Sequence, residues 1–429
     1  MGALGLVIVF LVAILIHIPI SMGIILSCLY LCVDGGYAIN TVISGTFTGV
    51  DSFTLLAIPM FMLCGNIMCK GGIANRIVDF AEALVGHITG GFGMITIVAC
   101  FFFAAIAGSA VATIGAIGAL MIPLMIEKGY HRDYSCALAS TASTMGPIVP
   151  PSVLFIPFGV MAGISVSTMF AAGMLPGLLM GICMAVCNFF ICKKNGFTGT
   201  GHRYSFKETM KVLKKTWASL LLPVFILVCI YGGFCTPTEV AVVATVYALI
   251  LGFFVYKELT IKDCLQVFMD TVPSAASVLI ICGPAVVFGR LLALERIPQS
   301  LTAWVTSHIG SKIIFLLLIN GILLIVGMFM ETTSAIMILT PLFVPLANSY
   351  GVNTYHFGMI MIVNLAIGLC TPPMGLCAFI GAKMGGTTFS KLFKWLLPLL
   401  ISLLVALMLI TFIPDITYAL PELLGMKVR

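Results

Sequence analysis

The sequence predicts an all-α polytopic membrane protein with two inverted-topology repeats, each holding a re-entrant helical hairpin and a broken helix. Hydrophobic residues make up 61% of the 429 residues and charged residues only 8%, whereas a soluble domain carries about 25% charge. The motifs of the first half recur in the second. Pro150-Pro151, one of the two Pro-Pro pairs, recurs as Pro372-Pro373, 222 positions later.

The apolar runs indicate how many segments enter the membrane. At roughly 20 apolar residues per crossing, the chain holds on the order of ten to thirteen crossings or re-entrant segments. These runs lie at roughly 3–32, 38–68, 92–126, 134–163, 168–192, 217–235, 238–256, 273–292, 311–348, 356–381 and 392–414. The polar interruption at 193–215 carries seven Lys or Arg residues, so the positive-inside rule predicts a cytoplasmic loop. We expect the basic tail at 426–429 on the same side.

The runs and the repeat together predict a division of the chain. We expect an N-terminal helix and connector at 1–51, a first repeat with hairpin and broken helix at 52–192, the basic loop at 193–215, scaffold helices at 216–275, and a second repeat with hairpin and broken helix at 276–429.

Loop charges indicate that the repeats are inverted. The loop 127–133 contains Lys128 and Arg132, while its counterpart 349–355 has no charge. The second half shows the reverse pattern, because the bases at 383–394 correspond to uncharged positions near 161–172. Basic loops that alternate between the halves are expected when one half is upside down relative to the other.

Each half contains two stretches that are poor continuous helix. One is a cluster of small and polar residues, at 105–118 and again at 327–340; the other is the Gly…Pro-Pro segment. Close helix packing explains small residues, but it does not explain Pro-Pro or Glu331 within an apolar run, where an ionisable residue is costly. Broken helices instead expose amides to an anion and carbonyls to a hard cation such as Na⁺. The nearby hydroxyls are Ser109, Thr113, Ser143, Thr144, Thr332, Thr333 and Ser334.

These segments resemble the large membrane subunit of tripartite ATP-independent periplasmic (TRAP) transporters. The matching stretches are LLAIPMFMLCGNIMCKGGIANRIVDF, GSAVAT, TASTMGPIVPPS, TPTEVA, LERIPQSL, ILTPLFVPLA and CTPPMG, in the family's order between 55 and 375. The resemblance implies a Na⁺-coupled importer of the bacterial inner membrane with an elevator mechanism, as in the ion transporter superfamily. It also implies two protein partners, a small four-helix membrane subunit and a periplasmic solute-binding protein that delivers an organic acid.

The resemblance also implies site residues. The first Na⁺ site is expected at Gly108, Ser109, Thr113, Gly146 and Pro150, and the second at Thr332, Thr333, Gly368, Thr371 and Pro372. The organic acid is expected near Ser109, Ser143, Glu331, Asn364 and Arg296. Glu331 stands where many relatives have Asp. Arg290 and Arg296 are the nearest bases for an anion, although each could also snorkel from a helix end, and Arg296 could pair with Glu295.

Several alternatives remain open from the sequence. A stand-alone Na⁺/dicarboxylate symporter of related architecture would need no binding protein. An intramembrane enzyme would need a constellation of catalytic residues that is missing around Glu331, and a channel would need a repeated filter. The fifteen cysteines form no C-x-x-C pair and the six histidines no H-E-x-x-H motif, so we expect no enzyme, no cofactor, no metal beyond Na⁺ and no nucleic-acid partner.

Overall fold

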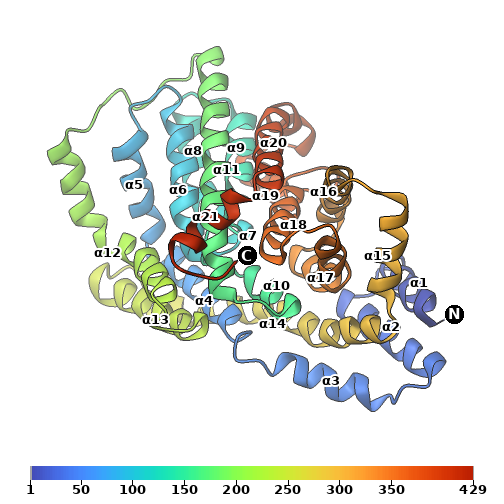
Figure 1. Cartoon of the computed structure of the whole chain (residues 1–429). Helices are drawn as coiled ribbons and strands as arrows, with labels where there is room; N and C mark the ends of the chain where they lie inside the picture. The colour runs from blue at the N-terminus through green and yellow to red at the C-terminus, as the bar shows by residue number, and fades with distance from the viewer. Residues whose placement is uncertain (1, 429) are drawn as a thin grey trace.

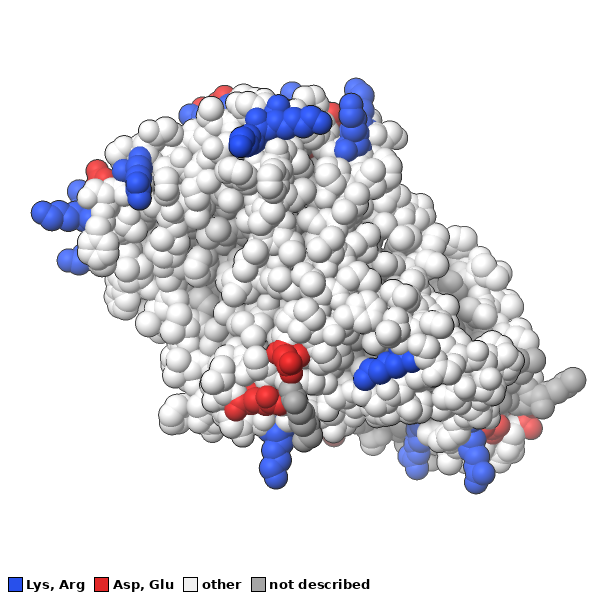
Figure 2. Space-filling model, turned by 45° about the horizontal axis from the view of Figure 1, so that its top comes forward, with Lys and Arg blue, Asp and Glu red and all other residues white. Residues whose placement is uncertain are grey.

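Helices alone make up the regular structure that the computed structural model describes, at residues 2–428, with side chains described from Gly5 onward. By length and composition, eight of these helices could cross a membrane, and a bent pair would make nine. Figure 2 shows Lys and Arg gathered toward two opposite edges of the face in view, with a broad uncharged band between them. Such a band is what a lipid-facing belt requires.

The first hairpin consists of α6 (Gly91–Ala107) followed by α7 (Ala110–Thr113), the π-helical turn η1 (Ile114–Gly118) and α8 (Ala119–Glu127). Gly108 reverses the chain at φ +60°, a conformation that costs glycine little. Both ends of the hairpin contact one loop: the Gly90 amide donates to the Phe197 carbonyl at 3.2 Å, and the Tyr130 hydroxyl donates to the Thr198 carbonyl at 2.7 Å. The hairpin therefore enters and leaves on the same side.

The second hairpin consists of α16 (Lys312–Phe329) and α17 (Thr332–Ser349). Its two ends also lie together, since Lys312 Nζ donates to the Gly351 carbonyl at 3.0 Å and the Phe315 and Tyr350 rings stack at 4.3 Å. The return limb of this hairpin begins at Thr332. The return limb of the first hairpin begins at Ala110, 222 positions earlier.

Each hairpin is followed by a helix that breaks. In the first half, α9 (Arg132–Ser143) and α10 (Phe155–Ala162) are separated by irregular chain at 144–154. In the second half, α18 (Thr354–Gly368) and α19 (Leu376–Gly385) are separated at 369–375. Both Pro-Pro bonds are cis. The breaks therefore fall where Gly and Pro disfavour a continuous helix.

The long helix α11 (Val166–Asn195) separates the bases of the two hairpins. Its 30 residues span about 45 Å. At its start, the Ser165 amide donates to the Tyr355 hydroxyl at 3.3 Å, and just past its end the Phe197 ring stacks on Tyr130 at 4.7 Å. The loops 127–133 and 349–355 thus lie at opposite ends of α11, the arrangement that an inverted repeat requires.

The remaining helices surround this centre. They are α1 (Gly2–Leu15), α2 (Ile20–Gly35), α3 (Asn40–Val50), α4 (Ala57–Lys70), α5 (Ile73–Val85), α12 (Phe206–Tyr231), α13 (Pro237–Ile250) with the π-helical turn η2 (Leu251–Val255), α14 (Ile261–Leu294) and α15 (Ile297–His308). Figure 1 shows α12 and α13 on one side and α1, α2 and α15 on the other, with the hairpins between them. The helix α14 packs against α2, α3, α4 and α17.

Two matching bends occur in the surrounding helices. The axes of α4 and α5 differ by 73°, and Gly72 at this bend has φ +72°. The corresponding junction of α14 and α15 has Arg296 at φ +55°. An arginine therefore occupies a left-handed position that the first half gives to glycine.

The C-terminal segment corrects one expectation. After α20 (Phe389–Phe412) and the short α21 (Asp415–Leu423), the Val428 carbonyl accepts a hydrogen bond from Asn353 Nδ2. The tail therefore lies beside the loop 349–355, at the opposite end of α11 from the basic loop. The expectation that the tail and the basic loop lie on one side is therefore wrong. The helix α20 begins beside Asp133, whose carboxylate accepts a hydrogen bond from the Thr387 hydroxyl. After α20 the chain does not cross back.

Candidate functional site

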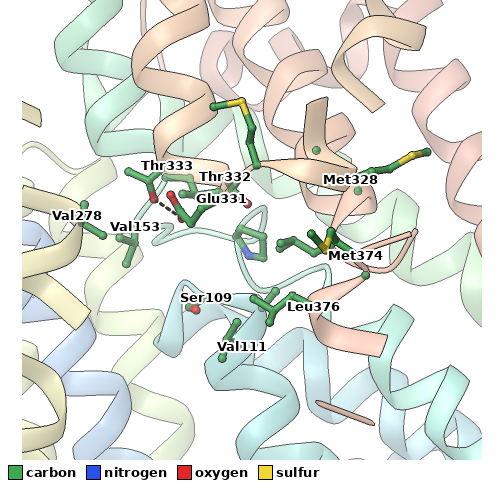
Figure 3. Close-up of a pocket in the computed structure, with 18 of the residues that line it drawn as sticks. Ser109, Val111, Val153, Val278, Met328, Glu331, Thr332, Thr333, Met374 and Leu376 are labelled. Atoms are coloured by element: carbon green, nitrogen blue, oxygen red, sulfur yellow. Dashed lines mark hydrogen bonds between the residues drawn. The ribbon is translucent and has the colours of Figure 1, made fainter. Parts of the chain in front are cut away.

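A cavity of about 330 Å³ lies where the tips of the two hairpins meet. The first hairpin contributes residues 108–111 and the second residues 327–333, while the two irregular segments contribute Pro147 and Met374 among others. Met62 of α4 and Val278 of α14 complete the wall. Figure 3 shows Glu331 and Thr333 on one side of the cavity and Ser109 and Val111 on the other. Both hairpin tips and both irregular segments thus reach one cavity.

Ser109 and Glu331 are the N-caps of the return helices and occupy equivalent positions of the two repeats, 222 residues apart. Ser109 Oγ accepts from the Ala112 amide at 3.5 Å. Glu331 Oε2 accepts from the Ser334 amide at 2.8 Å, and its Oε1 accepts from the Thr333 hydroxyl at 2.9 Å. The positive ends of two helix dipoles therefore point into the cavity.

Six of the predicted site residues line this cavity. They are Gly108, Ser109, Glu331, Thr332, Thr333 and Gly368. They come from both halves of the chain, so the structure brings together residues that are about 220 positions apart in sequence.

Other predicted residues support the first hairpin tip from behind. The Thr113 hydroxyl donates to the Ser109 carbonyl at 2.8 Å. A Cβ on Gly146 would come within 2.5 Å of that same carbonyl oxygen, and one on Gly108 within 2.8 Å of the Pro151 carbonyl oxygen, next to Pro150. These glycines allow the irregular segment to approach the tip closely.

The second half repeats this close approach with different partners. A Cβ on Gly368 would lie 2.4 Å from the Gly327 carbonyl carbon. Thr371 lies three residues further along the chain, and its hydroxyl donates to the Ile367 carbonyl at 2.9 Å. Thr371 and Pro372 are half-buried and lie in sequence between the lining residues Gly368 and Met374.

Three predicted substrate residues lie outside the cavity wall. The Ser143 hydroxyl is buried and donates to the Ser140 carbonyl at 2.7 Å. Asn364 Nδ2 donates to Asn320 Oδ1 at 2.7 Å, and Asn364 Oδ1 is the one buried side-chain polar atom without a partner in the part of the chain described. Arg296 is exposed at the bend between α14 and α15, and Arg290 is exposed as well.

A second cavity, of about 580 Å³, shares Ser109 and Glu331 with the first and extends toward α2, α4 and α14. The sequence reasoning missed its polar wall, formed by Ser21, Asn66, Ser274 and Ser277. One available signal was the pair Ser274 and Ser277, one helical turn apart within an apolar stretch.

The described residues that line the two cavities include no Lys, Arg or His. Glu331 is their one ionisable side chain. An anion in this space would therefore face helix N-termini, hydroxyls and amides together with the Glu331 carboxylate, and no basic side chain.

The chain matches the family model described as the tripartite ATP-independent periplasmic transporter, DctM component, over residues 6–416. It belongs to this family. It is a large permease subunit of a TRAP transporter, a multi-pass protein of the bacterial inner membrane, and its relatives are permeases rather than enzymes.

Two relatives of this TRAP permease match nearly end to end. The sialic acid TRAP transporter large permease protein SiaM of Vibrio cholerae is 39% identical over 94% of this chain and 95% of its own. The C4-dicarboxylate TRAP transporter large permease protein DctM of Pseudomonas aeruginosa is 39% identical, over 89% of each chain.

A solved structure shares the fold at low identity. The YdaH transporter of Alcanivorax borkumensis superposes with a TM-score of 0.66 at 13% identity, over 89% of this chain and 88% of its own. This likeness shows that the helix arrangement also occurs in a transporter of distant sequence.

Proposed function

We propose that this TRAP permease imports an organic acid together with Na⁺, after a periplasmic binding protein delivers the acid. The observation that carries the proposal is the cavity into which both hairpin N-termini point, with Ser109 and Glu331 as the paired caps. Helix N-termini favour a carboxylate. A small four-helix membrane subunit is the second partner, as in the family.

We assign one Na⁺ site to each repeat. Gly108, Ser109, Thr113, Gly146 and Pro150 form the first, and Thr332, Thr333, Gly368, Thr371 and Pro372 the second. The close approaches of Gly146 to Ser109 and of Gly368 to Gly327 support this assignment, because irregular backbone beside a hydroxyl supplies the oxygen ligands that Na⁺ needs. The ions would neutralise the charge of an incoming acid.

The acid lies between these sites. Ser109 and Glu331 face it directly in this proposal, because both line the two adjoining cavities. Ser143 and Asn364 act from the core behind the cavity wall, and Arg296 acts at most at the entrance, since it is exposed. The acids named for relatives, sialic acid and C4-dicarboxylates, define the first compounds to test.

The transport movement is an elevator. The hairpins and broken helices move as one body against α4 and α14, which contribute Met62 and Val278 to the cavity. Polar side chains on the stationary side, such as Asn66 and Ser277, let the cavity wall stay hydrated during the movement.

Reconstitution tests this function. Proteoliposomes holding the large and small subunits are given the binding protein and radiolabelled sialic acid or succinate. We expect uptake only with an inward Na⁺ gradient and with the binding protein present. Uptake by the large subunit alone would instead support the stand-alone symporter, and uptake without any Na⁺ gradient would exclude Na⁺ coupling.

A matched pair of variants ties the uptake to the cavity. Ser109→Leu fills a lining position and is expected to abolish Na⁺-dependent uptake while membrane insertion persists. Ser349→Leu changes an exposed serine at the base of the second hairpin and is expected to leave uptake unchanged. Equal uptake by both variants would place the transport path elsewhere.

A further inference from the structure

The turn between α12 and α13 holds two cysteines close together. The Phe234 amide donates to the Cys229 carbonyl at 3.0 Å and the Gly233 amide to the Ile230 carbonyl at 3.2 Å. With Gly233 at φ +68°, this pattern is a Schellman motif that ends α12 and folds the chain back over its last turn. The next residue, Cys235, is thereby brought onto Cys229.

Three features of this pair suit a disulfide. The Cys235 amide also donates to the Cys229 carbonyl, at 3.4 Å, a contact that places the two Cα atoms near the roughly 4.4–6.8 Å that a disulfide spans. The Cys235 side chain lies within electrostatic range of the Cys229 thiol. Both residues are half-buried free cysteines in this structure, so a reagent in solution can reach them.

The position of the turn decides its redox environment. The helix α12 starts at the basic loop 193–215, which the positive-inside rule places in the cytoplasm, and its 26 residues span about 39 Å. The groove that Cys235 lines is also lined by Ser165, at the opposite end of α11 from that loop. The pair therefore faces the periplasm, where disulfides form and persist.

We propose that Cys229 and Cys235 form an intramolecular disulfide in the mature permease. One thiolate attacks one sulfur of a periplasmic protein disulfide; the oxidant's S–S bond breaks, its other sulfur leaves as a thiolate, and a mixed disulfide forms. The second cysteine then displaces the oxidant's remaining sulfur. The two cysteines lose two electrons and two protons, and the oxidant's disulfide becomes two thiols.

The other cysteine contacts in the described chain lack this combination. The side chains of Cys370 and Cys377 also lie within electrostatic range of each other, but both are fully buried. Cys28 and Cys32 lie within one helix and are buried as well. A protein oxidant cannot reach these groups, so oxidation is selective for the Cys229 and Cys235 pair.

The disulfide would stiffen a contact between the surrounding helices and the hairpin body. The turn borders a groove of about 550 Å³ whose other wall includes Ser165 and Thr168 at the start of α11. The Tyr231 hydroxyl, at the end of α12, donates to the Phe170 carbonyl at 3.3 Å. A crosslink beside Tyr231 fixes the turn against which α11 rests.

Mass spectrometry tests the pair directly, because trypsin yields one peptide, Thr216–Lys257, whose only cysteines are these two. Membranes from aerobically grown cells are treated with iodoacetamide in denaturant, without reductant, and then digested. We expect this peptide unalkylated and two hydrogens lighter than its dithiol form. After dithiothreitol, both cysteines are expected to be alkylated.

Two variants control the assignment. In Cys235→Ser, the peptide is expected to carry one alkylated thiol without reduction. In Cys183→Ser, which removes another half-buried cysteine, the Thr216–Lys257 peptide is expected to remain oxidised. Two alkylated cysteines in the unreduced wild-type peptide would overturn the proposal, as would a lasting disulfide between either cysteine and another protein in place of the intramolecular bond.

Discussion

At the scale of residues, the repeat places a hydroxyl and a carboxylate at equivalent positions. Ser109 and Glu331 cap the return helices of their hairpins and line the same cavity. The carboxylate also accepts from Thr333 and Ser334. Glu331 therefore has a structural role as a cap, and we propose that its charge has a second role, in binding, that serine cannot have.

Replacing that charge separates the two roles. Glu331→Gln keeps an acceptor for the Ser334 amide but removes the negative charge from the cavity. We expect the Na⁺ concentration for half-maximal uptake to rise about tenfold, equivalent to roughly 1.4 kcal/mol. Glu127→Gln, an exposed glutamate at the far end of the first hairpin, is the control. Identical Na⁺ curves for both variants would confine Glu331 to capping.

A second residue-scale prediction concerns Arg296. Its left-handed backbone at φ +55° costs a non-glycine residue roughly 1 kcal/mol, and the equivalent residue of the first half is Gly72. We expect Arg296→Gly to leave uptake within about twofold, because the guanidinium lies outside both cavities, and to keep or raise the melting temperature of the purified protein. Loss of uptake with an intact fold would restore Arg296 as a substrate residue.

At the scale of elements, close backbone approach holds the broken helices against the hairpins. A Cβ on Gly368 would overlap the backbone of α16 at Gly327, and overpacking of this kind costs about 1–3 kcal/mol. We expect Gly368→Ala to push α16 from α18 and to lower uptake at least about tenfold. The matched control is Gly321→Ala on α16, where an added Cβ meets nothing within 4 Å. Equal uptake by the two variants would contradict this requirement.

At the scale of the whole molecule, the two repeats run in opposite directions along α11. The loop 127–133 lies at one end of α11 and the loop 349–355 at the other. We expect a membrane-impermeant maleimide to label Ser349→Cys in intact spheroplasts and Lys128→Cys only after permeabilisation, each measured above the signal of the parent chain. Labelling of both from outside would contradict the inversion.

The sequence by itself determined the membrane class, the two repeats and the places where helices break. Apolar runs of membrane length and the paired Pro and Gly positions depend on the local chemistry of each segment and not on its tertiary contacts. For the same reason, Gly108, Ser109, Glu331 and Gly368 could be singled out before any fold was known. The family resemblance added the expected roles of these residues.

Only the tertiary structure decided which of these residues meet. Asn364 and Ser143 belong to helices next to the site, yet their side chains point into the core, because helix rotation is set by packing and not by the distance along the chain. The polar wall at Ser274 and Ser277, the exposed position of Arg296 and the side on which the tail lies also depend on contacts between distant segments. Sequence periodicity indicates that a helix has a polar face, but it does not indicate which neighbouring helix that face contacts.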